Sequence, residues 1–279
     1  MNTLPIGIRD DQGRPFGLFL NMPEAEYHAV KAFSYSGSKQ IQKSPAHFQA
    51  YLKKEWEVSP DREKFKAVHL LTLEEDQHSR IVVKDGRWAG AVKDEVIALQ
   101  KEGKLVLKPD AYEDAKAISA ALKTHELAGK ILSRSVSEVS LFAVIDGVYC
   151  KGRIDSLYVD EADIFVGDLK NFGDLSRERL ISQFIHDNRF YWQMYFYGLL
   201  VEAVFERKVT NNYWFLAEDK PPHGVKVRTC SDAMIELAAQ ELNPLIQIYK
   251  ECTEKNNWPC YTGGAEAGGL PSYAWEQEK

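Results

Sequence analysis

The sequence predicts an α/β (α+β) fold in which a central mixed sheet is flanked by helices. Short segments rich in Val, Ile, Phe and Tyr gather in the middle of the 279-residue chain, and helical periodicity prevails before and after them. Strands grouped between helices are typical of a sheet covered by helices. Because 44% of the residues are hydrophobic, a sizeable core is expected, and residues 1–279 are predicted to form one domain.

The N-terminal half is predicted to consist of an irregular arm followed by helices. Residues 1–20 form the arm, since Met1–Gly17 is rich in Gly, Pro and Asp. Ser38 is a candidate N-cap of a helix that runs through Ile41 toward Pro45. Further helices are expected at residues 46–55, 61–75 and 110–132, where apolar residues recur at helical spacing.

The second half is predicted to begin with an antiparallel meander. Its three strands are Glu138–Ile145, Val148–Val159 and Asp163–Leu169, with a turn at Asp146-Gly147 between the first two. The remaining elements are expected in the order helix, strand, strand, helix and tail, at residues 176–206, 210–216, 225–229, 231–252 and 253–279.

Composition limits the classes of protein that this chain can be. No stretch approaches the roughly 20 apolar residues that span a bilayer, so no membrane partner is expected. The four cysteines are scattered and form no C-x-x-C pair, as is typical of a reducing compartment, and a cytoplasmic protein is predicted. The net charge of -6 does not exclude a nucleic-acid partner, because metal ions can neutralise carboxylates locally.

Asp155, Asp168 and Lys170 are the leading candidates for a catalytic site. In Asp168-Leu-Lys170 the two charged residues are two positions apart, so on a strand their side chains leave the same face. If the two strands pair as a hairpin, the carboxylates of Asp155 and Asp168 meet. Two carboxylates beside an ammonium suit Mg²⁺-dependent phosphodiester hydrolysis, in which the lysine orients or deprotonates the attacking water.

Four other residues are weaker candidates when taken singly. Glu138 opens the preceding strand, where it can reach a metal or simply end an edge. Gln193 and Tyr197 lie at i and i+4, hence on one face of a helix, and a polar interruption in an aromatic packing stripe explains them equally well. His69 lies with the apolar stripe of its helix, where a hydrogen-bonded core histidine is the commoner case.

The order of these residues resembles the nuclease motifs of the RecB-like branch of the PD-(D/E)xK superfamily. The wider sequence is similar to RecE-type exonucleases (exonuclease VIII-like) over roughly residues 20–275. The segments that carry this likeness are Glu26–His28, Tyr35–Ile41, Ser44–Phe48, Val68–Glu74, Gly103-Lys104 and His125–Ala128.

That resemblance implies a Mg²⁺-dependent exonuclease, with Mn²⁺ able to substitute, that degrades the 5′-ended strand of linear double-stranded DNA and leaves a 3′ single strand. A RecT-like single-strand annealing protein is the implied partner, a ring-shaped homotetramer the implied assembly, and a bacterial or phage-infected bacterial cell the implied setting. It also implies roles for the site residues. Metal ligands would be His69, Glu138, Asp155 and Asp168; Lys170 would position water; Gln193 and Tyr197 would support the site.

Two positions depart from the family pattern, and other functions remain open. The segment Phe65-Lys-Ala-Val-His69 stands where family members usually have a small, Gly-containing turn of helix before the histidine, and Asn171 stands where threonine is common. The fit of the DNA end is therefore expected to differ. The alternatives are a structure- or single-strand-specific nuclease of the same superfamily, and a catalytically silent member that binds DNA or protein. Cys230, Cys252 and Cys260 lack the compact spacing of an iron–sulfur nuclease.

Overall fold

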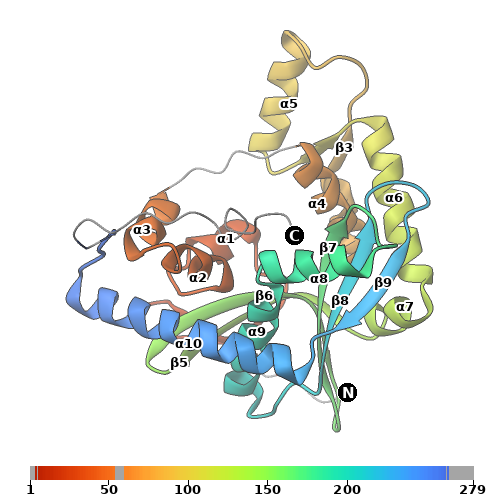
Figure 1. The fold of residues 1–279 in the computed structure, drawn as a ribbon. Coiled ribbons are helices and arrows are strands. Elements are labelled where there is room, and N and C mark those ends of the chain that lie inside the picture. The colour runs from red at the N-terminus through yellow and green to blue at the C-terminus, as the bar shows by residue number, and fades with distance from the viewer. Residues whose placement is uncertain (1–3, 5, 54–59, 262, 264–279) are drawn as a thin grey trace, which may run out of the picture.

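A computed structural model describes residues 4, 6–53, 60–261 and 263 of the chain. Its central feature is a seven-stranded sheet in the order β1-β2-β5-β6-β7-β8-β9 (Figure 1). The strands are β1 Ile8–Arg9, β2 Pro15–Phe19, β5 Val136–Ile145, β6 Val148–Val159, β7 Ile164–Phe172, β8 Asn211–Glu218 and β9 Val225–Thr229.

The sheet is mixed, as the sequence predicts. β5, β6 and β7 form the expected antiparallel meander, and Asp146 and Gly147 both take the positive φ angles that a tight hairpin turn requires. β7 and β8 are parallel, and such a pair needs a crossover connection. Helices α8 (Glu178–Asp187) and α9 (Phe190–Phe205) supply it.

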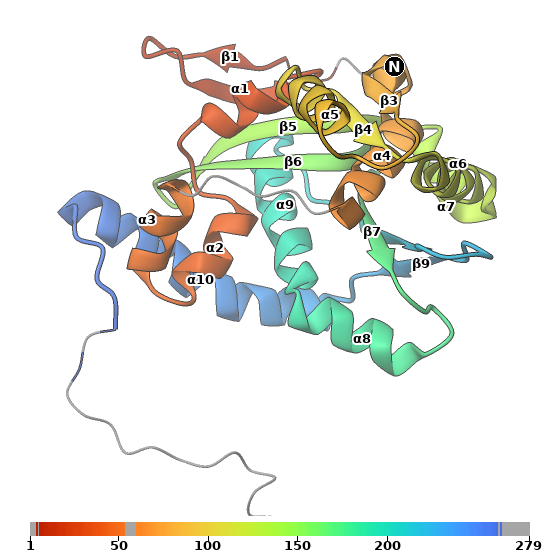
Figure 2. The same cartoon turned by 90° about the horizontal axis from the view of Figure 1, so that it is seen from above.

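Helices cover both faces of the sheet. α10 (Asp232–Lys255) packs along α9 on one face (Figures 1 and 2). The other face meets α4 (Pro60–Leu73), α6 (Pro109–Thr124) and α7 (Glu126–Leu132). Each face of the sheet has its own hydrophobic core, and successive side chains of β8 point to opposite cores. Trp214 and Leu216 belong to the core beneath α9, and Phe215 belongs to the core beneath α4 and α6.

The remaining elements lie outside the seven-stranded sheet. They are α1 Glu24–Ala29, α2 Tyr35–Ile41, α3 Pro45–Lys53, the 3₁₀ helix Glu75–Arg80, β3 Ile81–Val83, α5 Ala91–Lys101 and β4 Leu105–Leu107. α2 and α3 pack against α10, whereas β4 packs against α4 and α5. β3 and β4 form a separate two-stranded parallel sheet, and α5 projects from the molecule beside it (Figure 1). Over the described part of the chain, none of the helices has the length and apolar character needed to traverse a membrane.

Several predicted elements need correction. The arm is not irregular throughout, because β1 and β2 extend the sheet at its edge. Ser34, not Ser38, caps α2: the Ser34 side chain accepts a hydrogen bond from the Gly37 amide, whereas the buried Ser38 hydroxyl donates to the Tyr35 carbonyl. Most of the predicted tail, residues 253–279, and the end of the predicted helix 46–55 lie outside the described residues.

Two predicted long helices are each broken into two. The helix expected over 110–132 divides at His125, whose ring nitrogen accepts a hydrogen bond from the Ala128 amide and thereby caps α7. The helix expected over 176–206 divides at Arg189, which has a left-handed φ of 57°. The second break lets α9 leave in a new direction across the sheet (Figure 2).

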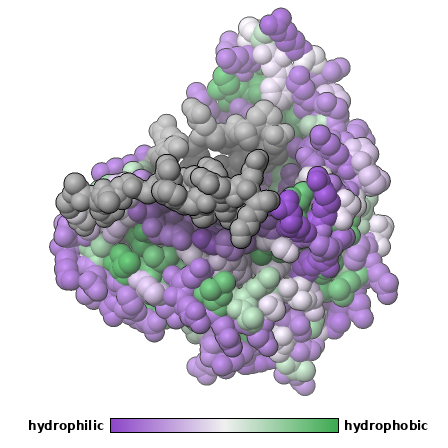
Figure 3. All heavy atoms as spheres, viewed as in Figure 1, coloured by the Kyte–Doolittle hydropathy of each residue, from purple (hydrophilic) through white to green (hydrophobic). Residues whose placement is uncertain are grey.

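On the face shown in Figure 3, hydrophilic residues predominate and hydrophobic ones form small separate patches. Apolar side chains are concentrated in the two cores instead. The four cysteines are free thiols.

Candidate active site

The site lies where β6 and β7 stop pairing. Ser156 pairs with Gly167, so the next position along both strands brings Asp155 opposite Asp168. The Asp155 carboxylate accepts a hydrogen bond of 2.8 Å from the backbone amide of Leu169, between Asp168 and Lys170. Lys170 forms an ion pair with Asp168. The structure therefore brings the Asp155 carboxylate to the backbone between Asp168 and Lys170 and pairs the latter two side chains with each other.

Three potential metal ligands converge beside this pair. One donor atom each from His69, Glu138 and Asp155 lies within 4.8 Å of the others, and His69 Nδ1 is 3.5 Å from Glu138 Oε1 and 3.8 Å from Asp155 Oδ2. Two carboxylates and an imidazole fit a divalent cation, which prefers such hard oxygen and nitrogen donors. Asp168, the fourth predicted ligand, lies outside this triad because its oxygens face Gln193 and Lys170.

A backbone irregularity turns Glu138 toward the triad. Val136 and Val139 both pack in the α9 core although they are three positions apart, so the side-chain alternation of β5 is interrupted between them. Glu138 has a φ of 51°, a left-handed conformation that is uncommon for a residue with a side chain. Such conformations cluster at functional sites, where the surrounding structure stabilises them.

Electrostatics in the triad favour a bound cation. Burial and the neighbouring Asp168 charge raise the pKa of Asp155 above its ordinary value. Burial opposes the charged form of His69, but the charges of Asp155 and Glu138 outweigh it and raise the pKa of His69 to about 9. At neutral pH the imidazolium thus partly neutralises the carboxylates, and a metal ion that replaces its proton takes over that role.

Gln193 and Tyr197 tie α9 to both catalytic strands. The Gln193 side-chain amide donates a hydrogen bond to Asp168 Oδ1 at 2.6 Å and lies 2.9 Å from the Tyr197 hydroxyl. The Tyr197 hydroxyl in turn donates to the Arg153 carbonyl at 2.5 Å. Gly152 permits this approach, since a Cβ there would lie 2.6 Å from Leu200. The shared face that the i, i+4 spacing predicts is confirmed.

Lys170 lies in a cationic and aromatic setting that the sequence did not indicate. Its ammonium is 4.5 Å from the centre of the Phe190 ring, the first residue of α9 after the break at Arg189. Lys39 of α2 also interacts with Lys170: burial and the charge of Lys170 lower the pKa of Lys39. Lys39 lies within Tyr35–Ile41, a segment that carries the family likeness, but it was not predicted as a site residue, because only the docking of α2 brings it to the site.

Of the two departures from the family pattern, Phe65 contacts a candidate site residue directly. The Phe65 ring packs edge-on against His69, with ring centres 5.1 Å apart. The buried side-chain oxygen of Asn171 has no hydrogen-bond partner among the described residues. Phe65 therefore restricts the orientation of one potential ligand, whereas Asn171, one position after Lys170 on β7, extends from the opposite face of the strand.

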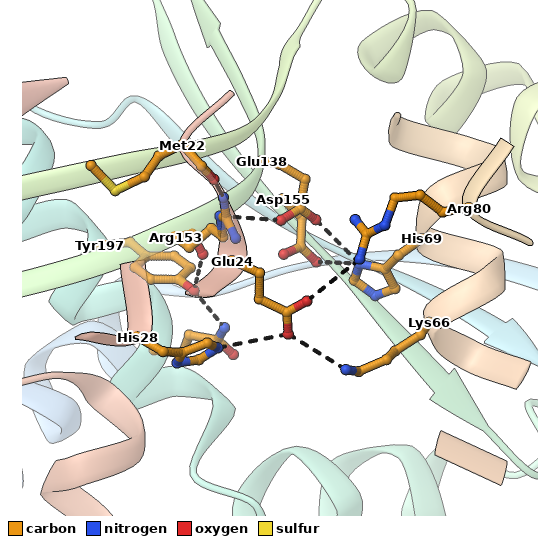
Figure 4. A network of polar contacts seen from close by, with 11 residues as sticks. Met22, Glu24, His28, Lys66, His69, Arg80, Glu138, Arg153, Asp155 and Tyr197 are labelled. Carbon is orange, nitrogen blue, oxygen red and sulfur yellow. Dashed lines mark hydrogen bonds and ion pairs between the residues drawn. The ribbon is translucent and has the colours of Figure 1, made fainter. Parts of the chain in front are cut away.

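A second network of charged side chains surrounds the triad, and sequence reasoning missed it (Figure 4). Arg153 Nε lies 3.5 Å from Glu138 Oε2. Farther out, Glu24 of α1 meets Lys66 of α4 at 3.4 Å and Arg80 at 3.9 Å. These residues are far apart in the chain, so no local spacing could have identified them.

Two basic side chains of β6 hold both ends of α1 beside the site. Lys151 donates to the carbonyls of Tyr27 and Val30 at 2.8 and 2.7 Å, and burial lowers the pKa of Lys151 to about 8. The Arg153 guanidinium donates to the Met22 carbonyl. α1 is therefore attached to β6 by contacts that do not involve Glu24.

Comparisons with known proteins agree with this architecture. A crystal structure from Eubacterium rectale, described as a "Putative exonuclease", superposes with a TM-score of 0.61 at 13% identity, over 92% of this chain and 99% of the other. A Scheffersomyces stipitis Rai1 structure matches at 10% identity over 88% of this chain and 80% of the other, but its TM-score of 0.31 supports no structural inference. No curated protein sequence matches the chain.

A family model identifies the fold more directly. It matches residues 34–269 and is described as a PDDEXK-like domain of unknown function (DUF3799). That range includes β6, β7 and every candidate site residue. The mixed sheet, the carboxylates at the point where β6 and β7 diverge, and the match over most of the sequence lead to one conclusion: this chain belongs to the PDDEXK-like DUF3799 family.

Proposed function

We propose that this protein is a Mg²⁺-dependent exonuclease, with Mn²⁺ able to substitute, that degrades the 5′-ended strand of linear duplex DNA and leaves a 3′ single strand. The observation that carries the proposal is the triad of His69, Glu138 and Asp155 beside the Asp168–Lys170 ion pair. Membership of the PDDEXK-like family and a fold shared with a protein described as a "Putative exonuclease" support it. The strand polarity rests on the RecE-type sequence resemblance.

The site residues can divide the chemistry among them. His69, Glu138 and Asp155 would hold the divalent ion, with Asp168 as a further ligand, and the ion would lower the pKa of bound water and stabilise charge on the phosphate. Lys170 is placed to orient the attacking water or accept its proton. In hydrolysis the water oxygen bonds to phosphorus, the bond from phosphorus to the 3′ oxygen breaks, and that oxygen takes up a proton.

Digestion of linear duplexes labelled at either the 5′ or the 3′ ends tests the proposal. With Mg²⁺ present, the 5′ label should appear first as a mononucleotide, while the 3′ label stays in a long single strand. Covalently closed circles should resist digestion, because an exonuclease needs an end. Wild-type protein should lose the activity in EDTA.

Three results would contradict the proposal. Linearisation of the circles would indicate endonuclease action, and preferential digestion of unpaired strands would indicate a single-strand-specific enzyme. DNA binding without metal-dependent nucleotide release would indicate a catalytically silent member of the family.

We also propose that the protein assembles as a ring-shaped tetramer and passes the 3′ strand to a RecT-like annealing protein. Both ideas derive from the sequence resemblance. Light scattering after size-exclusion chromatography measures the assembly, and a monomeric mass would refute the ring. Co-purification with a co-expressed RecT-like annealing protein measures the partnership, and no recovery of that protein would refute it.

A further inference from the structure

We infer that Lys66 and Arg80 form a subsite for a DNA phosphate next to the scissile one, and that the Glu24 carboxylate occupies this subsite when DNA is absent. The inference rests on the proposed nuclease function and extends it to how the substrate strand is held. It begins from the convergence of basic side chains on Glu24, seen in Figure 4.

Glu24 receives basic groups from two separate parts of the fold. Its Oε1 lies 3.4 Å from Lys66 Nζ and 3.7 Å from His28 Nε2, and its Oε2 lies 3.9 Å from Arg80. Lysine and arginine side chains are positively charged groups, whereas a histidine contributes charge only when it is protonated. A single carboxylate thus faces two positive charges. A phosphodiester also carries two oxygens that share a negative charge, so it can take the place of the carboxylate between these cations.

The position of the cluster fits a phosphate next to the one that is cut. Lys66 precedes His69 by three residues on α4, so both project from the same side of the helix. Three residues of a helix advance about 4.5 Å, and successive phosphates of one strand lie about 3.4 Å apart along the duplex axis. The cluster is therefore within reach of the first or second phosphate beyond the metal triad.

Exposure distinguishes this cluster from the triad beneath it. The side chains of Glu24, Lys66 and Arg80 are 45%, 41% and 36% exposed, whereas those of His69, Glu138 and Asp155 are 23%, 17% and 13% exposed. Ligand can reach the outer cations directly, and water competes with their ion pairs. A DNA strand that enters the triad passes this cluster first.

The carboxylate can leave without loosening the fold. α1 is held to β6 by the hydrogen bonds from Lys151 and Arg153 to backbone carbonyls. α4 is held by the buried Val68, Leu70 and Leu71 in the second core. Because each side has its own anchor, the ion pairs between Glu24 and the two cations are not required to dock α1.

The affinity for a labelled linear duplex tests the inference. The measurement uses Ca²⁺ in place of Mg²⁺, and a gel checks that the DNA is recovered intact, so that binding is measured without cleavage. Lys66→Gln should weaken binding about 2- to 10-fold and reduce the salt slope by about 1, the signature of one lost phosphate contact. Glu24→Gln should tighten binding about 2- to 5-fold, since an exposed competitor is removed. In a Lys66→Gln, Arg80→Gln background, Glu24→Gln should give no gain.

The Glu113–Lys116 ion pair on the outer surface of α6 provides matched controls, because it is similarly exposed. Glu113→Gln and Lys116→Gln should leave affinity and salt slope as in the wild type. If the Glu24 and Lys66 variants behave like these controls while wild-type protein binds and digests DNA, the inference fails and the nuclease function stands. If Glu24→Gln lowers the melting temperature without tightening binding, Glu24 is structural. If wild-type protein binds no duplex, both proposals fail.

Discussion

Two neighbouring groups of charged side chains in this molecule are held in opposite ways. Around Asp168, which is 1% exposed, the contacts run in a continuous chain from Lys170 and Gln193 to Tyr197 and the β6 backbone. Around Glu24 the contacts to Lys66, His28 and Arg80 are exposed ion pairs of 3.4 to 3.9 Å. The first group is fixed by folding, and the second can exchange partners with solvent.

The difference separates positioning from binding. A buried network in a low effective dielectric resists rearrangement, because an unpaired buried charge costs several kcal/mol. Exposed ion pairs contribute about 0 to 1 kcal/mol and are screened by salt. The group around Asp168, called the inner group below, is therefore suited to hold reacting atoms in place. The group around Glu24, the outer group, is suited to take up and release a strand.

The largest expected effect comes from removing the inner carboxylate. Asp168→Ala should reduce the rate of nucleotide release by about a thousandfold or more, because it removes both a proposed metal ligand and the partner of Lys170. The exposed Asp174→Ala serves as the control. Digestion of labelled duplex measures the rates, and thermal unfolding checks that both variants fold. Retention of near-normal turnover in a folded Asp168→Ala protein would remove Asp168 from the site.

Lys170→Ala should give the next largest loss. We expect kcat to fall about 10²- to 10⁴-fold, the usual range for a lost proton-transfer group, while metal and DNA affinity change only a few-fold. Single-turnover cleavage and calorimetric metal titration measure the two effects separately. Unchanged turnover would contradict a catalytic role, and an equally large loss of metal affinity would show that the lysine serves the metal site instead.

The strands that carry the inner group could be predicted from the sequence because they follow local rules. The Asp146-Gly147 turn and the apolar runs around it define β6 with its observed bounds. Asp168 and Lys170 share a side through the two-residue period of a strand. The register of this hairpin then brings Asp155 to Asp168.

The rest depends on tertiary contacts that no local pattern encodes. The break at Arg189 contains neither Gly nor Pro, so the helical pattern continues through it. At this break the Asn188 carbonyl accepts a hydrogen bond from Tyr35, 153 positions earlier. The outer group likewise joins Glu24 to Lys66, 42 positions away, and is formed only when α1 and α4 dock.

Metal affinity should increase with pH because the triad binds protons that a cation must displace. The pKa of His69 is about 9 without metal, so below that value each unit of pH should raise the affinity about tenfold through this group. The raised pKa of Asp155 should steepen the dependence at lower pH. Above pH 9 the affinity should level off.

Calorimetry in buffers of different ionisation enthalpy counts the released protons. His69→Gln should abolish the release between neutral pH and pH 9. A wild-type affinity that stays constant over this range would show that His69 is not a ligand.

The smallest expected effect compares two tyrosines on the same helix. The buried Tyr197 hydroxyl contacts Gln193 and the Arg153 carbonyl, whereas the exposed Tyr195 hydroxyl bonds to Asn243 at 3.0 Å. Tyr197→Phe should lower the free energy of unfolding by about 1 to 3 kcal/mol, because it leaves a buried acceptor unpaired. Tyr195→Phe should change the free energy of unfolding by less than about 0.5 kcal/mol, since water replaces the lost partner. Urea unfolding measures both. Equal losses in the two variants would mean that the inner group is no more rigidly held than the surface, and the distinction between positioning and binding would lose its physical basis.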